Sequence, residues 1–393
     1  MSHVWPLRPS FAAVWGECAG AVKASVQFPS AETDATRNGT AAHWVVAEVL
    51  EACKIAPAEA IHMLSDCSRF LGKTAPNGVV IDDEMFQGAQ VMVDDVLELA
   101  GERLHDVVVE HAVHIPTVHP QNGGTLDAAL WVPEEGRLIL WDYKNGHRKV
   151  KAEGNKQFVE YLEGLREQIG INGHTDQQVR VMVRAVQPHA YQNKGPLDVW
   201  ECWLSDIRPI VNRLNMKAAE AMSENPTITA GLHCRDCPAL GKCSASREYV
   251  YGALEIANRP YEMDEMTIDD LATERNILKD VLAVAKRRAE AIEDDLTHRI
   301  QGGEFCKSLR LDGSYGNEEY TIPPKQAAAL ASQFGFNIME EKVKTPTQAR
   351  AACPKKHKAA FNLVLDKFTR RPPRGMTLTE AEGSTAARAF SKK

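Results

Sequence analysis

The sequence predicts an α/β protein: a mixed sheet flanked by helices, followed by a mainly helical C-terminal extension. Three observations predict this. Two long segments near the start repeat apolar residues at helical spacing, a middle segment alternates at strand spacing, and helical and strand-like segments then alternate to about residue 224. Mixed helical and strand-like patterning of this kind is typical of layered α/β folds.

The helical segments are amphipathic. In residues 38–54, Val45, Val46 and Val49 fall on one face when the chain is wound as a helix. We expect helices at residues 11–26, 38–54, 84–102, 156–170 and 207–224.

The strand-like segments are short and rich in β-branched residues. Residues 105–115, 123–132 and 137–144 follow one another, and the turn-type sequence PEEG separates the last two. This spacing predicts an antiparallel meander. Two further strands are expected at residues 178–188 and 198–205.

The character of the chain changes near residue 255, so we expect regions at 1–254 and 255–393. The second region opens with a long amphipathic helix, which begins at Thr267 with Asp270 in the capping-box position and ends at Gly302 and Gly303. Short strands are expected at residues 305–311 and 318–322, and helices at 325–333, 346–352 and 355–368.

Composition narrows the functional class only broadly. The formal net charge of -7 for the whole chain does not favour nucleic-acid binding. Residues 342–393, however, are strongly basic, with 13 Lys/Arg against 3 Asp/Glu. This segment is either a phosphate-binding surface or a solvated tail. No apolar run reaches the roughly 18–20 residues of a membrane span, and the N-terminus is not that of a signal peptide. We therefore expect a cytoplasmic protein without membrane contact, in which nine cysteines do not form a disulfide framework.

Two carboxylates and a lysine lie on neighbouring expected strands. Asp142 and Lys144 share a strand face because side chains alternate with period two, and the preceding strand can bring Asp127 beside Asp142. Two acidic groups can hold Mg²⁺ or Mn²⁺ together with the backbone carbonyl of Tyr143, and a lysine can orient the attacking water. The alternative is a surface ion pair, which the apolar run before Asp142 disfavours.

Several short motifs together resemble the RecB-like PD-(D/E)XK nucleases. They are GTAAH (39–43), GTLD (124–127), WDYK (141–144) and Gln157-x-x-x-Tyr161, in the order of that family. The resemblance covers about residues 8–250 and implies a restriction-endonuclease-like core. It implies that the metal is held by His43, Asp127, Asp142 and the Tyr143 carbonyl, that Lys144 is catalytic, and that Gln157 and Tyr161 contact DNA or position the site. Family members often carry a glutamate at the position of Glu110, a candidate further metal contact.

Four cysteines suggest a second site. Cys234, Cys237 and Cys243 share a compact loop, and Cys18 is the expected fourth ligand. The segment around Cys18 resembles the opening of a phage-borne branch of RecB-like nucleases, whose cysteines, one N-terminal and three C-terminal, hold a 4Fe–4S cluster. Zinc and four unligated thiols are the alternatives.

The resemblance implies a DNA exonuclease of phage or prophage recombination, working in the bacterial cytoplasm with a single-strand annealing protein. It leaves a homo-oligomer open. One alternative is a catalytically silent nuclease fold that binds DNA or a recombination partner. Another is a cysteine-liganded interaction protein in which the carboxylate–lysine motif is incidental.

Overall fold

The computed structural model describes residues 5–28, 32–171, 173–190, 195–257, 267–315, 319–338, 344–354, 357–370 and 373–380. The chain forms two compact units, residues 1–288 and 289–393. Across the described ranges, none of the helices has the length and apolar character needed to cross a membrane.

A five-stranded mixed sheet forms the centre of the first unit, and it confirms the predicted α/β class. Its strands are β1 (Val108–His114), β2 (Gly123–Val132), β3 (Arg137–Tyr143), β4 (Arg180–Val186) and β5 (Leu197–Trp203), in that spatial order. β1, β2 and β3 form the predicted antiparallel meander. β3 then pairs with β4 in parallel, and β4 with β5 in antiparallel orientation.

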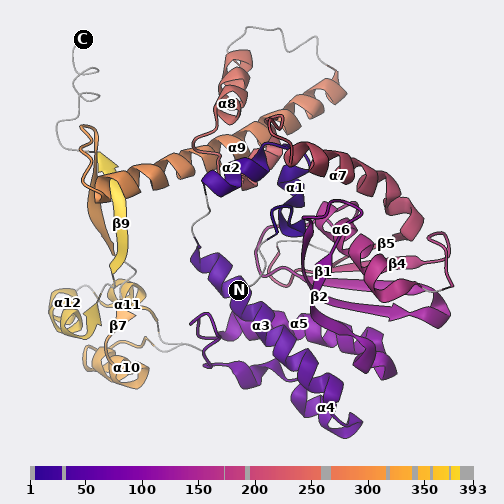
Figure 1. Cartoon of the computed structure of the whole chain (residues 1–393). Helices are drawn as coiled ribbons and strands as arrows, with labels where there is room; N and C mark the ends of the chain where they lie inside the picture. Colours follow the sequence, from indigo (N-terminus) through magenta and orange to yellow (C-terminus); the bar gives the residue numbers. More distant parts are fainter. Residues whose placement is uncertain are drawn as a thin grey trace. The chain divides into compact units, whose positions relative to one another are not determined.

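Helices cover both faces of this sheet (Figure 1). One face carries α3 (Asp34–Ile55) and α5 (Asp83–Ala100), with α4 (Ala58–Leu64) following α3. The other carries α6 (Lys156–Leu165) and α7 (Arg208–Ala221). The central strand β3 packs on both layers: Trp141 belongs to the α3/α5 core and Leu140 to the α6/α7 core. Burial on both faces explains its unbroken apolar run.

The helix predicted at residues 11–26 is wrong in one respect, because it is broken into α1 (Ala12–Trp15) and α2 (Ala21–Gln27). At the break, the Gly20 N–H donates to the carbonyl of Thr227 at 2.9 Å. A Cβ on Gly20 would lie 2.7 Å from Ile228 Cγ1, so a larger residue here would have to displace that side chain. The break leaves Cys18 facing the segment around residue 228.

Two helices end the first unit. α8 (Ser244–Ala257) was not predicted. α9 (Ile268–Gln301) was, and its capping box is present: Thr267 and Asp270 exchange backbone-to-side-chain hydrogen bonds of 3.1 and 3.2 Å. α9 continues past Arg288, where the first unit ends, into the second unit.

The second unit pairs β6 (Leu309–Tyr315) with β9 (Pro373–Glu380), and β7 (Glu319–Tyr320) with β8 (Thr369–Arg370). Its helices are α10 (Pro324–Gln333), α11 (Pro346–Ala352) and α12 (Lys358–Leu365), which enclose a small core around Phe361. The strand predicted at 305–311 was wrong in its bounds, because pairing with the unpredicted β9 sets its start at Leu309. Residue 318 and residues 355–356, at the ends of two other predicted elements, lie outside the described residues.

Candidate metal centre and cysteine site

Sheet pairing brings the two predicted aspartates together. β2 and β3 pair Ala128 with Trp141, and the same register continued by one residue sets Asp127 opposite Asp142. The Tyr143 N–H donates to Asp127 Oδ2 at 2.6 Å, which holds this carboxylate at the end of β3.

Asp142, Lys144 and Gln157 form one connected group. Lys144 Nζ lies 2.8 Å from Asp142 Oδ2, and it donates to Gln157 Oε1 at 3.0 Å. Gln157 Nε2 donates in turn to Asp142 Oδ1 at 3.1 Å. Asp142 is buried, so it requires such partners. The Lys144 ammonium at Asp142 Oδ2 and the Gln157 amide at Oδ1 together supply those partners.

Helix α6 supplies Gln157 and Tyr161 from the same face. The Asn155 side chain accepts the Gln157 N–H and so caps the helix at its start. One turn on, the Tyr161 hydroxyl donates to the Thr125 carbonyl at 2.7 Å, which ties α6 to β2. The structure therefore brings both predicted α6 residues onto the strands that carry the aspartates.

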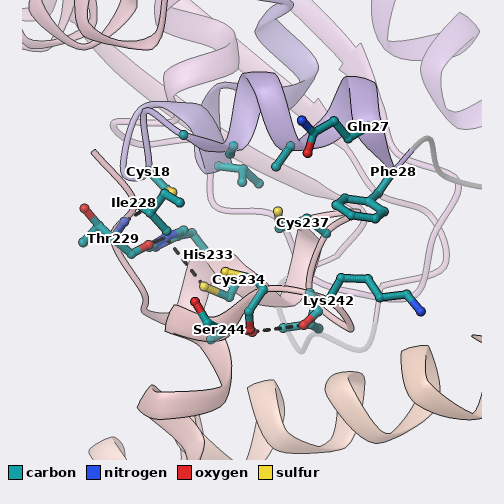
Figure 2. Close-up of a pocket in the computed structure, with 18 residues that line it drawn as sticks. Cys18, Gln27, Phe28, Ile228, Thr229, His233, Cys234, Cys237, Lys242 and Ser244 are labelled. Atoms are coloured by element: carbon teal, nitrogen blue, oxygen red, sulfur yellow. Dashed lines mark hydrogen bonds between the residues drawn. The ribbon is translucent and has the colours of Figure 1, made fainter. Parts of the chain in front are cut away.

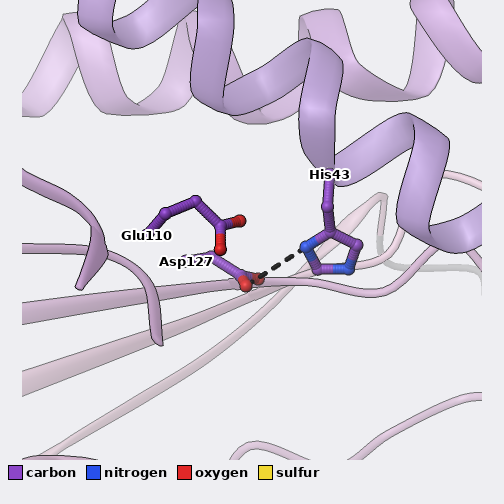
Figure 3. Close-up of side chains that lie close together, drawn as sticks. All are labelled: His43, Glu110 and Asp127. Atoms are coloured by element: carbon purple, nitrogen blue, oxygen red, sulfur yellow. Dashed lines mark ion pairs between the residues drawn. The ribbon is translucent and has the colours of Figure 1, made fainter. Parts of the chain in front are cut away.

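His43, Glu110 and Asp127 form a second group beside the first (Figure 3). His43 Nδ1, from α3, lies 3.1 Å from Asp127 Oδ1, and one donor atom from each of the three residues lies within 4.8 Å of the others. Glu110 has a φ of 44°, the sole positive φ among the non-glycine residues that the structure describes. Backbone strain of this kind is found at functional sites more than elsewhere.

The close charges shift the titration of the whole group. Burial alone would lower the pKa of His43, but the neighbouring Asp127 and Asp142 outweigh it and raise that pKa to about 9. Burial and the charge of Asp127 raise the pKa of Asp142 to about 6, although Lys144 opposes them. Burial and Asp127 also raise the pKa of Glu110. Burial opposes the charge of Asp127, but His43 and Lys144 outweigh it and lower the pKa of that carboxyl. Mutual pKa shifts among closely packed groups are typical of functional sites, and a bound metal ion would take the place of the His43 proton.

The five predicted metal ligands do not all play the same part. His43, Glu110 and Asp127 converge within the described part of the chain, as one nitrogen and two carboxylate donors. This donor set suits Mn²⁺ or Mg²⁺. Asp142 stands next to this group and bonds to Lys144 and Gln157, and Tyr143 contributes its N–H to Asp127.

A cavity of about 510 Å³ opens onto this candidate metal-ligand group of His43, Glu110 and Asp127. His43, Glu110 and Asp127 line it together with Trp44 and Asn77, which the sequence did not single out. Trp44 directly follows His43 on α3, and this adjacency in the sequence could have suggested that Trp44 lies near the site.

All four predicted cysteines line one cavity of about 250 Å³ (Figure 2). Cys18 enters from the break between α1 and α2, where its Sγ accepts the Thr229 N–H at 3.4 Å, and the other three come from the loop before α8. All four thiols are free. Burial raises the pKa of Cys237 to about 11, and the neighbouring Cys234 and Cys18 add to the rise.

Two ion pairs join the cysteine site to the metal centre. Glu17, next to Cys18, pairs with Lys156, which precedes Gln157. Asp236, next to Cys237, pairs with Arg148 on the connection after Lys144 at 2.7 Å. These contacts were not predicted, because they join segments far apart in the sequence.

Comparison with known proteins supplies a family and no activity. No curated protein matches this sequence. Residues 6–384 match a family described as a protein of unknown function, DUF2800. The match spans both structural units and almost the whole chain, so this protein belongs to the DUF2800 family.

Proposed function

We propose that this protein is a metal-dependent DNA exonuclease with a RecB-like PD-(D/E)XK core. One observation carries the proposal: the His43, Glu110 and Asp127 group stands directly beside the bonded pair of Asp142 and Lys144. A metal-ligand set next to a buried acid and a lysine is what phosphodiester hydrolysis requires. The proposal extends to a cytoplasmic role in phage or prophage recombination beside a single-strand annealing protein.

The residues of the proposed site have separate roles in hydrolysis. Mg²⁺ or Mn²⁺, when bound, supplies a lowered pKa of water and positive charge at the scissile phosphate. His43, Glu110 and Asp127 would hold the ion, and Asp142 lies opposite Asp127 across the β2–β3 pair. Lys144 orients the attacking water or neutralises the developing charge. Gln157 keeps the Lys144 ammonium in place through its hydrogen bond of 3.0 Å.

Replacing Lys144 tests the proposal. Lys144→Ala should lower the rate of metal-dependent cleavage of linear duplex DNA by about 100-fold or more, because it removes the positive group next to Asp142. The matched control is Lys151→Ala, whose side chain is exposed and pairs with Glu153. Cleavage by Lys144→Ala at the rate of the control would contradict the proposed site.

We further propose that Cys18, Cys234, Cys237 and Cys243 hold a 4Fe–4S cluster. Their shared cavity and thiolate chemistry fit the group. Four thiolates also suit zinc, and the arrangement of one N-terminal and three C-terminal cysteines favours the cluster through the resemblance. When bound, the cluster supplies a covalent clasp between the two ends of the nuclease unit.

Loss of one cysteine tests the cluster. Cys237→Ser should remove iron and visible absorbance and lower the melting temperature, because the clasp loses a ligand. The matched control Cys202→Ser, on β5, should keep the full iron content. A wild-type protein that is purified anaerobically and contains zinc without iron would favour the zinc alternative instead.

A further inference from the structure

Helix α9 carries an exposed apolar stripe beside the face that packs against α8. Val281 and Val284 are buried in a cluster with Val250 and Leu240. Six large apolar side chains of α9 are exposed instead; one of them, Ile277 at 55%, lies off the stripe, and the other five lie on it. These five are Ile268, Leu271, Leu278, Leu282 and Ile292, with exposed fractions of 82, 37, 42, 67 and 40%.

The spacing of this stripe is that of a coiled-coil seam. Positions 268, 271, 275, 278, 282, 285, 289, 292 and 296 alternate steps of three and four residues, and all but Arg275 are apolar. These are heptad positions a and d. α9 is continuous over 34 residues, but Ala285 packs against the cluster of Val284 within its own chain, so the most open part of the seam is residues 268–282. An exposed apolar stripe of this length marks an interaction surface.

We propose that α9 pairs with α9 of a second copy of this chain in a parallel two-stranded coiled coil. In a parallel pair, each g position faces the e position of the next heptad on the partner helix. Glu274 would then face Lys279 of the partner subunit, and the e residue Glu293 would face the g residue Arg288. Both pairs are of opposite charge.

The charges disfavour the antiparallel arrangement. There, e positions face e positions, and Lys279 and Lys286 repel near the middle of the seam. Arg288 also donates to the Leu240 carbonyl within its own chain, so its pair with Glu293 contributes less to the orientation. Arg275 is the single polar residue at an a position, a feature that selects register and dimers at some cost in stability.

The molar mass of the full-length protein tests the pairing. Light scattering over a range of concentrations should approach twice 43.4 kDa for the wild type. Leu278→Glu with Leu282→Glu should weaken self-association more than about tenfold. The matched control, Thr273→Glu with Asn276→Glu, adds the same charge to exposed positions off the seam and should remain dimeric.

Cross-linking tests orientation without disrupting the helix. Leu271→Cys lies at a d position, so mild oxidation should give more covalent dimer than in the wild type, whereas Thr273→Cys should not. Lys279→Glu should weaken the dimer, and adding Glu274→Lys should restore it.

Three results would overturn the inference: a wild type that stays monomeric at every concentration, a dimer that survives both seam substitutions, or equal cross-linking from Leu271→Cys and Thr273→Cys. None of these measurements reads cleavage, so they leave the nuclease proposal to its own test.

Discussion

Glu110 reaches the metal-ligand group through a backbone conformation that side chains rarely adopt. Its φ of 44° lies in the left-handed region, where a non-glycine residue costs about 1–3 kcal/mol. Partial burial and the nearby Asp127 also raise its pKa, so folding makes its charged form less favourable than in the unfolded chain. A residue kept under both penalties is expected to serve the site rather than the fold.

Replacing Glu110 should therefore separate stability from metal binding. Glu110→Gly should raise the free energy of unfolding of the metal-free protein by about 1 kcal/mol, because glycine tolerates positive φ. The same change should weaken Mn²⁺ binding. Glu110→Gln keeps the backbone strain and removes the charge, so it should weaken Mn²⁺ binding while its stability gains only from the lost repulsion with Asp127. Urea unfolding in EDTA measures the stability of the metal-free variants, and a separate Mn²⁺ titration measures their affinity for the metal. Unchanged Mn²⁺ affinity in both variants would remove Glu110 from the ligand set.

The ion pair of His43 and Asp127 predicts a pH dependence. The pKa of His43 rises from 6.5 to about 9 on folding, so the pair stabilises the metal-free protein fully below pH 6.5. That stability is lost as pH rises through 9. His43→Gln should remove this loss between pH 6.5 and 9, whereas His62→Gln, exposed on α4, should keep it. The measurement is urea unfolding in EDTA at several pH values. A wild type whose stability is flat over this range would contradict the pairing.

At the scale of elements, the docking of α6 on the sheet positions Gln157 and Tyr161. Gly164 lies where α6 crosses the end of β1, and a Cβ there would meet Val113 at 2.1 Å and Ile115 at 2.9 Å. No side chain fits this crossing without moving the helix. The close approach sets the distance between α6 and the strands that carry the aspartates.

Gly164→Ala should therefore lower both stability and cleavage. Overpacking should cost about 1–3 kcal/mol of unfolding free energy, and the shifted helix should draw Gln157 away from Lys144. Gly252→Ala is the matched control, because a Cβ at this position of α8 meets nothing within 4 Å. Thermal unfolding and cleavage rate measure the outcome. Equal stability of the two variants would mean that α6 is not held at this crossing.

How much of this the sequence could predict depends on the range of the contacts. Strand alternation was enough to place Asp142 and Lys144 together, because it is a local rule. The turn of Glu110 was not predictable, since nothing in VVVEHAV signals a positive φ. The break that presents Cys18 depends on contacts with residues 227 and 228, and β6 depends on β9, about 60 residues later. Such long-range pairings leave no periodic signal in a single sequence.

At the scale of the molecule, charge divides between the units. Residues 289–393 hold 17 Lys/Arg and 13 Asp/Glu, which leaves residues 1–288 with 29 and 40 of the totals of 46 and 53. The unit that carries the proposed site is acidic, so it repels DNA phosphates unless cations offset its charge. The proposed contact of the basic C-terminal segment with DNA stays a prediction, and it fits this division of charge.

The most direct test of the central claim is one cleavage measurement on linear and closed circular duplex DNA of the same sequence. The wild type is incubated with each, end-labelled where linear, in Mg²⁺, Mn²⁺ or EDTA. We predict metal-dependent loss of the linear DNA only, with release of the end label showing which end is attacked. Cleavage of circular DNA at a similar rate would contradict the exonuclease assignment. An absence of cleavage in either metal, with DNA still bound, would contradict the nuclease itself.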